Sequence, residues 1–149
     1  RLDRHTPLQL DIDHGKGVTP MSETRTIASP QPNPETEEFW AAARNGKLMI
    51  GSCKSCSKTH WYPRAICPHC FSDQTELKQA AGTGEIYSFS VMKRSKIPYA
   101  IAYVTLAEGP KMMTNIVDTD LDAISIGQKV KVVFKDTEDG PPVPMFTPA

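Results

Sequence analysis

The sequence predicts a mainly β chain in which a short N-terminal helix precedes a four-cysteine metal ribbon and a five-stranded barrel. Three observations support this order. An apolar stripe with helical spacing comes first, all four cysteines then fall in two Cys-x-x-Cys pairs, and apolar and polar residues alternate after Gly82. The chain has 149 residues, 13 prolines and 39% hydrophobic residues. This composition favours small modules, one of them held together by metal, over one large core.

The first 20 residues differ in pattern from the rest of the chain. Met21-Ser22-Glu23-Thr24 has the pattern of a natural start, so we expect residues 1–20 to be a tag or upstream sequence. The alternation in residues 8–12 also fits an edge strand that pairs with a neighbouring molecule. Residues 21–46 are expected to form a polar, proline-bearing arm and then the helix.

The helix is expected over residues 33–45. Asn33 is a good N-cap, Pro34 suits the first helical position, and Asn45-Gly46 is a stop signal. Acidic residues in the first turn complement the positive end of the helix dipole.

The apolar stripe of this helix contains Phe39, Trp40 and Ala43. A stripe of that width cannot hold a lone helix in water, so it must dock on its own domain or on a partner. Exposed aromatic residues often mark interfaces. We therefore expect Phe39, Trp40 and the ribbon residue Phe71 to belong to a partner interface.

The cysteine pairs predict a metal ribbon over residues 47–79. The four residues are Cys53, Cys56, Cys67 and Cys70. Two Cys-x-x-Cys turns supply four thiolates at tetrahedral corners, which suits Zn²⁺. Two disulfides are the alternative, but disulfide-rich chains carry more cysteine for their length. Rubredoxin-type iron uses the same ligands and stays open. Because protein groups fill all four positions, we expect the metal to be structural.

The barrel is expected over residues 80–149. Its predicted strands lie at residues 87–92, 99–106, 112–117, 129–135 and 143–146. Turn signals at residues 108–110 and 139–141 separate some of these runs. An OB-fold is the best-known barrel of that size, and an SH3-like barrel is the alternative.

Charge argues against several classes of partner. Seventeen basic and seventeen acidic residues cancel, and no apolar run approaches the length of a membrane span. Ribbons and OB-folds commonly bind nucleic acid, and Tyr87, Phe89 and Tyr103 are aromatic residues on which bases stack. However, residues 80–149 hold seven basic and eight acidic side chains. Since a groove that tracks phosphates needs a positive excess, nucleic-acid binding is the less favoured alternative.

The chemistry of the side chains predicts a non-catalytic chain. With all four cysteines committed to metal, no nucleophilic thiol remains, and the sequence has no Gly-x-Ser-x-Gly elbow or phosphate-binding Gly-rich loop. We expect His69 to face solvent, although it lies between two ligands. His60 is expected to serve in packing or in a local hydrogen bond.

The ordered set of motifs resembles the thiolase-associated zinc-ribbon/OB-fold proteins, a family long catalogued as a domain of unknown function and found with acyl-CoA enzymes. The resemblance covers about residues 33–149. It rests on Phe39-Trp40, Cys53-x-x-Cys56, Cys67-Pro68-His69-Cys70, residues 84–91, residues 126–130 and Pro144-Met145-Phe146.

This resemblance implies a rubredoxin-like zinc ribbon followed by an OB-fold, in an accessory subunit without catalytic residues. Its partner would be a thiolase-superfamily enzyme, such as a thiolase, aldolase or acyltransferase, and it would assist acyl-CoA binding and complex assembly. The alternative is a scaffold that bridges two acyl-CoA enzymes without touching substrate. Because thiolates that bind zinc need a reducing compartment, we expect a cytoplasmic protein.

An acyl-CoA site needs basic residues for the phosphates of the nucleotide. The best cluster is Lys93, Arg94 and Lys96, in the loop after the first barrel strand. The alternative is that this charged loop is simply solvated.

Overall fold

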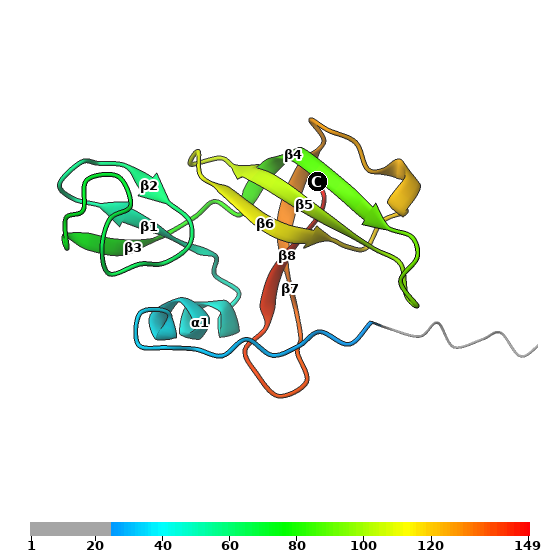
Figure 1. The fold of residues 1–149 in the computed structure, drawn as a ribbon, viewed down its shortest axis with the longest axis horizontal. Helices are drawn as coiled ribbons and strands as arrows, with labels where there is room; N and C mark the ends of the chain where they lie inside the picture. The colour runs from blue at the N-terminus through cyan, green and yellow to red at the C-terminus, as the bar shows by residue number, and fades with distance from the viewer. Residues whose placement is uncertain (1–24) are drawn as a thin grey trace, which may run out of the picture.

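The computed structural model describes residues 25–149. The tag and the edge strand expected in the first 20 residues lie outside this range. Figure 1 shows the order of the elements along the chain. They are α1 (Glu37–Arg44), β1 (Met49–Cys53), β2 (Thr59–His60), β3 (Thr75–Gln79), β4 (Thr83–Met92), β5 (Tyr99–Leu106), β6 (Lys111–Ile116), the 3-10 helix η1 (Leu121–Ala123), β7 (Lys129–Lys135) and β8 (Val143–Pro148).

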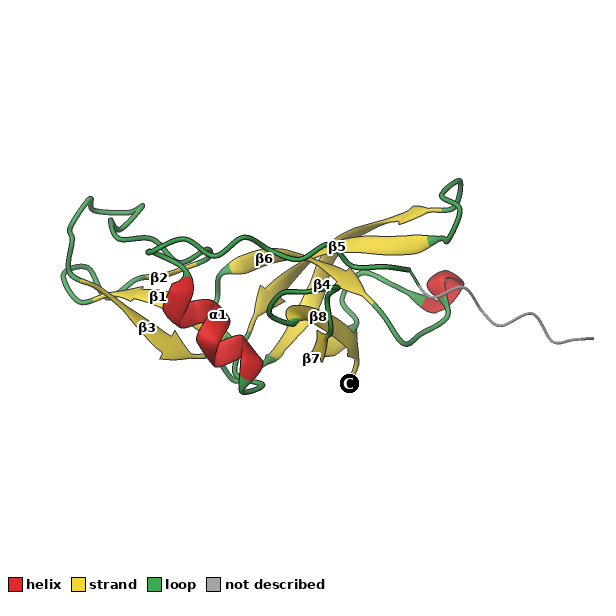
Figure 2. Cartoon of the chain, turned by 90° about the horizontal axis from the view of Figure 1, so that it is seen from below, coloured by secondary structure: helices red, strands yellow, loops and turns green. Residues whose placement is uncertain are grey.

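The strands form two sheets at opposite ends of the molecule (Figures 1 and 2). The ribbon is a three-stranded antiparallel sheet in the order β2-β1-β3. The second sheet is a closed barrel in the order β4-β5-β6-β8-β7. The predicted fold class is therefore confirmed: the chain is mainly β, with one short helix, a ribbon and a five-stranded barrel.

The barrel has the strand order expected of an OB-fold. Strands β4, β5 and β6 form an antiparallel meander, and β7 pairs with both β4 and β8. The barrel closes where β6 and β8 run parallel, through the single register pair Ile116 and Phe146. The alternating pattern of β5 is seen in its burial, since Ala100, Ala102 and Val104 all point inward.

One hydrophobic core joins the helix, the ribbon and the barrel. Phe39 of α1, Ile50 of β1, and Ile86 and Phe146 of the barrel are fully buried members of the same cluster. The apolar stripe of α1 thus docks on its own chain, which is one of the two outcomes the sequence allowed. The ribbon and the barrel share an interior although their sheets are separate.

The helix begins later than predicted. It starts at Glu37, and Thr36 is its N-cap residue. The Asn33 side chain instead accepts hydrogen bonds from the Thr36 backbone N–H at 3.1 Å and the Thr36 hydroxyl at 3.0 Å. Pro34 and the next two residues form a turn before the helix. The Asn33 side chain stabilises that turn. Within residues 25–149, no helix is long and apolar enough to cross a membrane.

The second ribbon strand, β2, is only two residues long. It ends at His60, and Trp61 and Tyr62 leave the sheet to pack on Phe39. The ring centroids of Trp61 and Tyr62 both lie 5.4 Å from that of Phe39, in edge-to-face arrangements. Aromatic packing between ribbon and helix has replaced sheet pairing at this point.

Candidate metal centre

The four cysteines meet at the tips of two turns, which we call the first knuckle (residues 53–57) and the second knuckle (residues 67–71). The Sγ atoms of Cys53 and Cys70 are 3.6 Å apart, those of Cys56 and Cys67 are 3.8 Å apart, and all four lie within 4.8 Å of one another. A tetrahedral ion with Zn–S bonds of about 2.3 Å places its sulfurs about 3.8 Å apart. The cysteines are free, so the geometry fits a metal and not the disulfide alternative.

The two knuckles have the same backbone geometry. In each, the residue after the second cysteine donates its N–H to the carbonyl of the first: Ser57 to Cys53 at 2.9 Å, and Phe71 to Cys67 at 3.0 Å. Ser57 and Phe71 also share a left-handed conformation, with φ of 57° and 62°. This left-handed conformation was not predicted from the sequence. The signal that could have indicated it is the position of both residues, directly after a Cys-x-x-Cys pair.

The electrostatics of the sulfurs favour a bound cation. The pKa of Cys53 is lowered to about 7, mainly because the backbone N–H of Cys56 donates to its sulfur. At Cys70 the backbone N–H of Ser72 also lowers the pKa, but desolvation and the other three sulfurs outweigh it and raise the pKa to about 12. Four neighbouring thiolates therefore need a compensating charge. A divalent cation would supply it, so these residues fit a metal.

Two histidines lie near the centre, and neither belongs to the sulfur cluster. His69 is exposed, and its Nε2 lies 3.2 Å from the carbonyl oxygen of Thr59. His60 is only 4% exposed, and neither ring nitrogen has a hydrogen-bond partner. Its ring covers Gly51, where a Cβ would lie 2.6 Å from the His60 Cδ2. Desolvation first, and then the charges of His69 and Arg64, lower the pKa of His60, so the ring packs as a neutral group.

The structure corrects the interface expected on the helix. Phe39 is 0% exposed and Trp40 is 7% exposed. Their rings contact each other at 4.9 Å between centroids, and both pack against Tyr62. Phe39 and Trp40 are core residues and do not present a surface to a partner, because the ribbon and barrel supply the apolar contacts the stripe needs. Phe71, in contrast, is 79% exposed.

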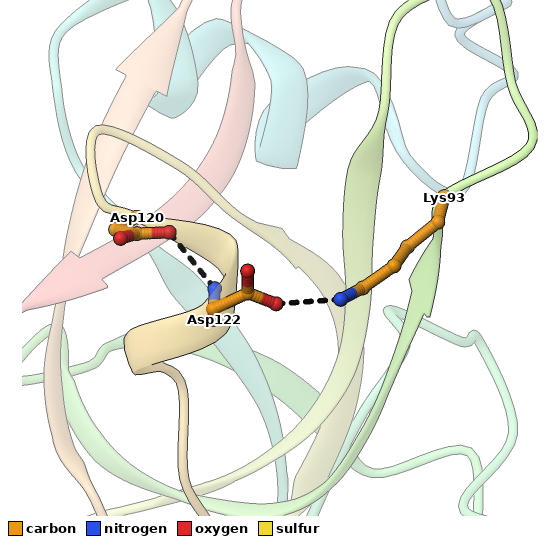
Figure 3. Close-up of polar contacts among 3 residues, drawn as sticks. All are labelled: Lys93, Asp120 and Asp122. Carbon is orange, nitrogen blue, oxygen red and sulfur yellow. Dashed lines mark hydrogen bonds and ion pairs between the residues drawn. The ribbon is translucent and has the colours of Figure 1, made fainter.

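The basic cluster lies far from the metal centre, in the hairpin loop between β4 and β5 (Figure 1). Lys93 Nζ forms an ion pair with Asp122 Oδ1 of η1 at 2.6 Å (Figure 3). The hydrogen bond to Asp122 is the main cause of the raised pKa of Lys93. The Asp120 carboxylate accepts a hydrogen bond from the Asp122 backbone N–H at 3.0 Å, which fixes the turn that carries Asp122. One cation of the predicted cluster is thus already paired.

Comparison with known protein families gives two adjacent matches, which together cover residues 40–135. Residues 40–76 match the family described as the ChsH2 rubredoxin-like zinc ribbon domain, and residues 77–135 match the ChsH2 C-terminal OB-fold domain.

Three individual proteins illustrate the similarity. A probable enoyl-CoA hydratase alpha subunit of Thermomonospora curvata is 35% identical over 117 residues, which cover 74% of this chain but only 37% of that protein. A DUF35 domain-containing scaffold protein of Methanothermobacter thermautotrophicus is 34% identical over 118 residues, covering 71% of this chain and 89% of that protein. A solved structure, titled Ltp2-ChsH2(DUF35) aldolase, superposes with a TM-score of 0.70 at 32% identity, covering 80% of this chain and 98% of that chain.

Proposed function

The chain belongs to the ChsH2-type, or DUF35, family of zinc-ribbon and OB-fold proteins, and from this membership we propose that it is a non-catalytic, zinc-binding subunit of a thiolase-superfamily enzyme complex. The observation that best supports the proposal is the closed four-sulfur centre. All four cysteines of the chain lie in it, so no thiol is left to act as the nucleophile of thiolase chemistry. The similarity to a chain of an aldolase complex points to the same class of role.

The role proposed for the metal is structural. The ribbon sheet has only three short strands, and the four sulfurs lie where two of its loops meet. A filled coordination shell leaves no position for a substrate. Zinc is the proposed ion, with iron as the alternative, and the reducing cytoplasm is the proposed location because the ligands must remain thiolates.

The test of this function is complex formation. The chain would be co-expressed with each thiolase-superfamily subunit encoded beside it in its native genome. We expect one of these subunits to co-elute with the chain at a fixed ratio in size-exclusion chromatography, and we expect acyl-CoA turnover only when the enzyme subunit is present. Turnover by the isolated chain would contradict the proposal, as would the absence of any stable complex. Salt-sensitive retention on single-stranded DNA would support the nucleic-acid alternative instead.

A finer proposal is that the subunit assists acyl-CoA binding, with Lys93, Arg94 and Lys96 contacting the phosphates. All three side chains are exposed on one hairpin loop. One charge-assisted hydrogen bond to phosphate is worth about 1.5–3 kcal/mol, so the loss of even a single such contact in the K93A/R94A/K96A variant is expected to weaken acyl-CoA binding by the complex at least roughly tenfold.

The ion pair with Asp122 offers a matched control for this prediction. Asp122→Asn releases Lys93 from its partner, and we expect it to tighten acyl-CoA binding by up to about fivefold. Isothermal titration of the intact complex measures both effects. Unchanged affinity in both variants, with the complex still assembled, would favour the scaffold that bridges two enzymes without contacting substrate.

A further inference from the structure

Phe71 is the most exposed of the large hydrophobic residues in the described part of the chain, at 79%. It follows the last cysteine ligand, at the outer end of the second knuckle. Ile66, directly before Cys67 in the same loop, is 49% exposed. We call these two side chains the Phe71 tip. They place two large apolar groups on a ribbon whose other exposed residues are mostly polar.

The backbone of Phe71 has a conformation that suits glycine. Its φ of 62° is left-handed, and a bulky side chain is disfavoured there because its Cβ crowds the following carbonyl. Glycine in this position would form the same knuckle without that cost. Within residues 25–149, no aromatic contact of Phe71 compensates for it, since the packed aromatic pairs all involve α1 and the residues that cover it. The isolated chain therefore gains little from this ring.

Hydrogen bonds hold the backbone that carries the tip. The Phe71 N–H donates to the Cys67 carbonyl at 3.0 Å, and the Cys67 N–H donates to the Ser72 carbonyl at 2.9 Å. The hydroxyls of Ser55 and Ser72 also join the two knuckles at 2.8 Å. An aromatic side chain has only two rotatable bonds, so on an ordered backbone it binds with little loss of conformational entropy, which is a property of anchor residues in interfaces.

In the loops that carry the two knuckles basic side chains outnumber acidic ones, and Asp73, whose carboxylate accepts a hydrogen bond from the Gln74 side chain, is the acidic residue closest in sequence to Phe71. Lys58 and Arg64, in the loops that carry the two knuckles, are exposed and have no ion-pair partner among residues 25–149. The carboxylate of Glu76 is already shared by two lysines, at 3.0 and 3.4 Å. A second copy of the chain in a two-fold contact would bring like charges together, which disfavours self-association through this surface.

We infer that the Phe71 tip docks into an apolar pocket with an acidic rim on the partner enzyme subunit. The inference rests on the proposed function, because it concerns the surface through which the subunit joins its enzyme. The apolar pocket would accept Phe71 and Ile66, and the acidic rim would pair with Lys58 and Arg64.

The experiment compares Phe71→Gly with Ser57→Gly in binding to the thiolase-superfamily subunit that co-elutes with the wild-type chain. Both substitutions place glycine at the equivalent left-handed position of a knuckle. Both therefore remove the steric cost of a side chain in that conformation. We expect Phe71→Gly to weaken the complex roughly thirtyfold, as loss of an anchor residue does, while the melting temperature of the isolated chain stays the same or rises. Ser57→Gly should leave affinity within about twofold.

The outcomes separate the inference from the proposed function. If the wild-type chain binds no enzyme subunit, both fail. If it binds and Phe71→Gly binds equally well, only the inference fails. Sedimentation of the chain alone gives a third outcome: a wild-type dimer that Phe71→Gly dissociates would show that the tip contacts a second copy, and would overturn the assignment to an enzyme. If a Lys58→Glu/Arg64→Glu variant binds as tightly as wild type, the pocket on the partner has no acidic rim that pairs with these residues.

Discussion

Cys67→Ser is expected to empty the metal centre and unfold the ribbon. The Cys67 side chain is fully buried, and its sulfur lies 3.8 Å from that of Cys56. Serine replaces a thiolate with a weak neutral ligand, and a structural zinc site contributes about 10–16 kcal/mol of apparent binding free energy to its fold. We expect the metal content to fall from about one ion per chain to less than roughly a tenth of that. Elemental analysis of freshly purified protein measures the loss and distinguishes zinc from iron.

The matched control for this variant is His69→Ala. His69 lies between two ligands in the sequence, but its ring nitrogen faces the Thr59 carbonyl. The variant should therefore keep its full metal content. Loss of metal from His69→Ala, or full metal content in Cys67→Ser, would mean that the four-sulfur ligand set is wrong.

Phe39→Ala is expected to cause a large loss of stability without touching the metal centre. The ring is fully buried and contacts Trp40, Trp61 and Tyr62, so it joins the helix to the ribbon. Truncating a buried phenylalanine costs about 3–5 kcal/mol, because the transfer free energy of the ring is lost and a cavity remains. That is a large share of the roughly 5–15 kcal/mol that stabilises a typical domain.

Phe71→Ala makes the same chemical change at an exposed position and serves as the control. We expect it to change the free energy of unfolding by less than about 0.5 kcal/mol. Both variants would be unfolded with urea in the presence of saturating zinc, so that metal loss does not contribute. A loss below about 1 kcal/mol for Phe39→Ala would indicate that the helix does not dock on the ribbon as the structure shows.

The cysteine ligands and the barrel strands were predictable because their signals are local. A Cys-x-x-Cys turn brings two sulfurs together whatever surrounds it, and the period-two alternation of β5 follows from the pleat of a strand. The resemblance to a known family pointed to the same architecture through the order of these motifs. Each Cys-x-x-Cys pair and each strand pattern lies within about a dozen residues of sequence.

The surface on which the apolar stripe of α1 docks could not be predicted in the same way. Phe39 and Trp40 showed that the helix had to be covered, but the same stripe suits an intramolecular core and a partner interface equally well. Likewise, the sequence could not place Asp122 beside Lys93, because η1 and the β4–β5 loop meet only when the barrel closes. Asn33 was assigned to the helix end because asparagine is a favoured N-cap residue, whereas its side chain accepts the Thr36 N–H in the turn before the helix.

Short-range spacing thus decided the chemistry available at the ribbon, because each Cys-x-x-Cys pair supplies two of the four sulfurs that could hold one metal ion. Folding decided which of the three aromatic residues expected at an interface stay accessible, since it buried Phe39 and Trp40 and left Phe71 exposed. The physical reason is that burial depends on contacts between segments far apart in the chain, whereas ligand spacing and strand alternation depend on the local backbone alone.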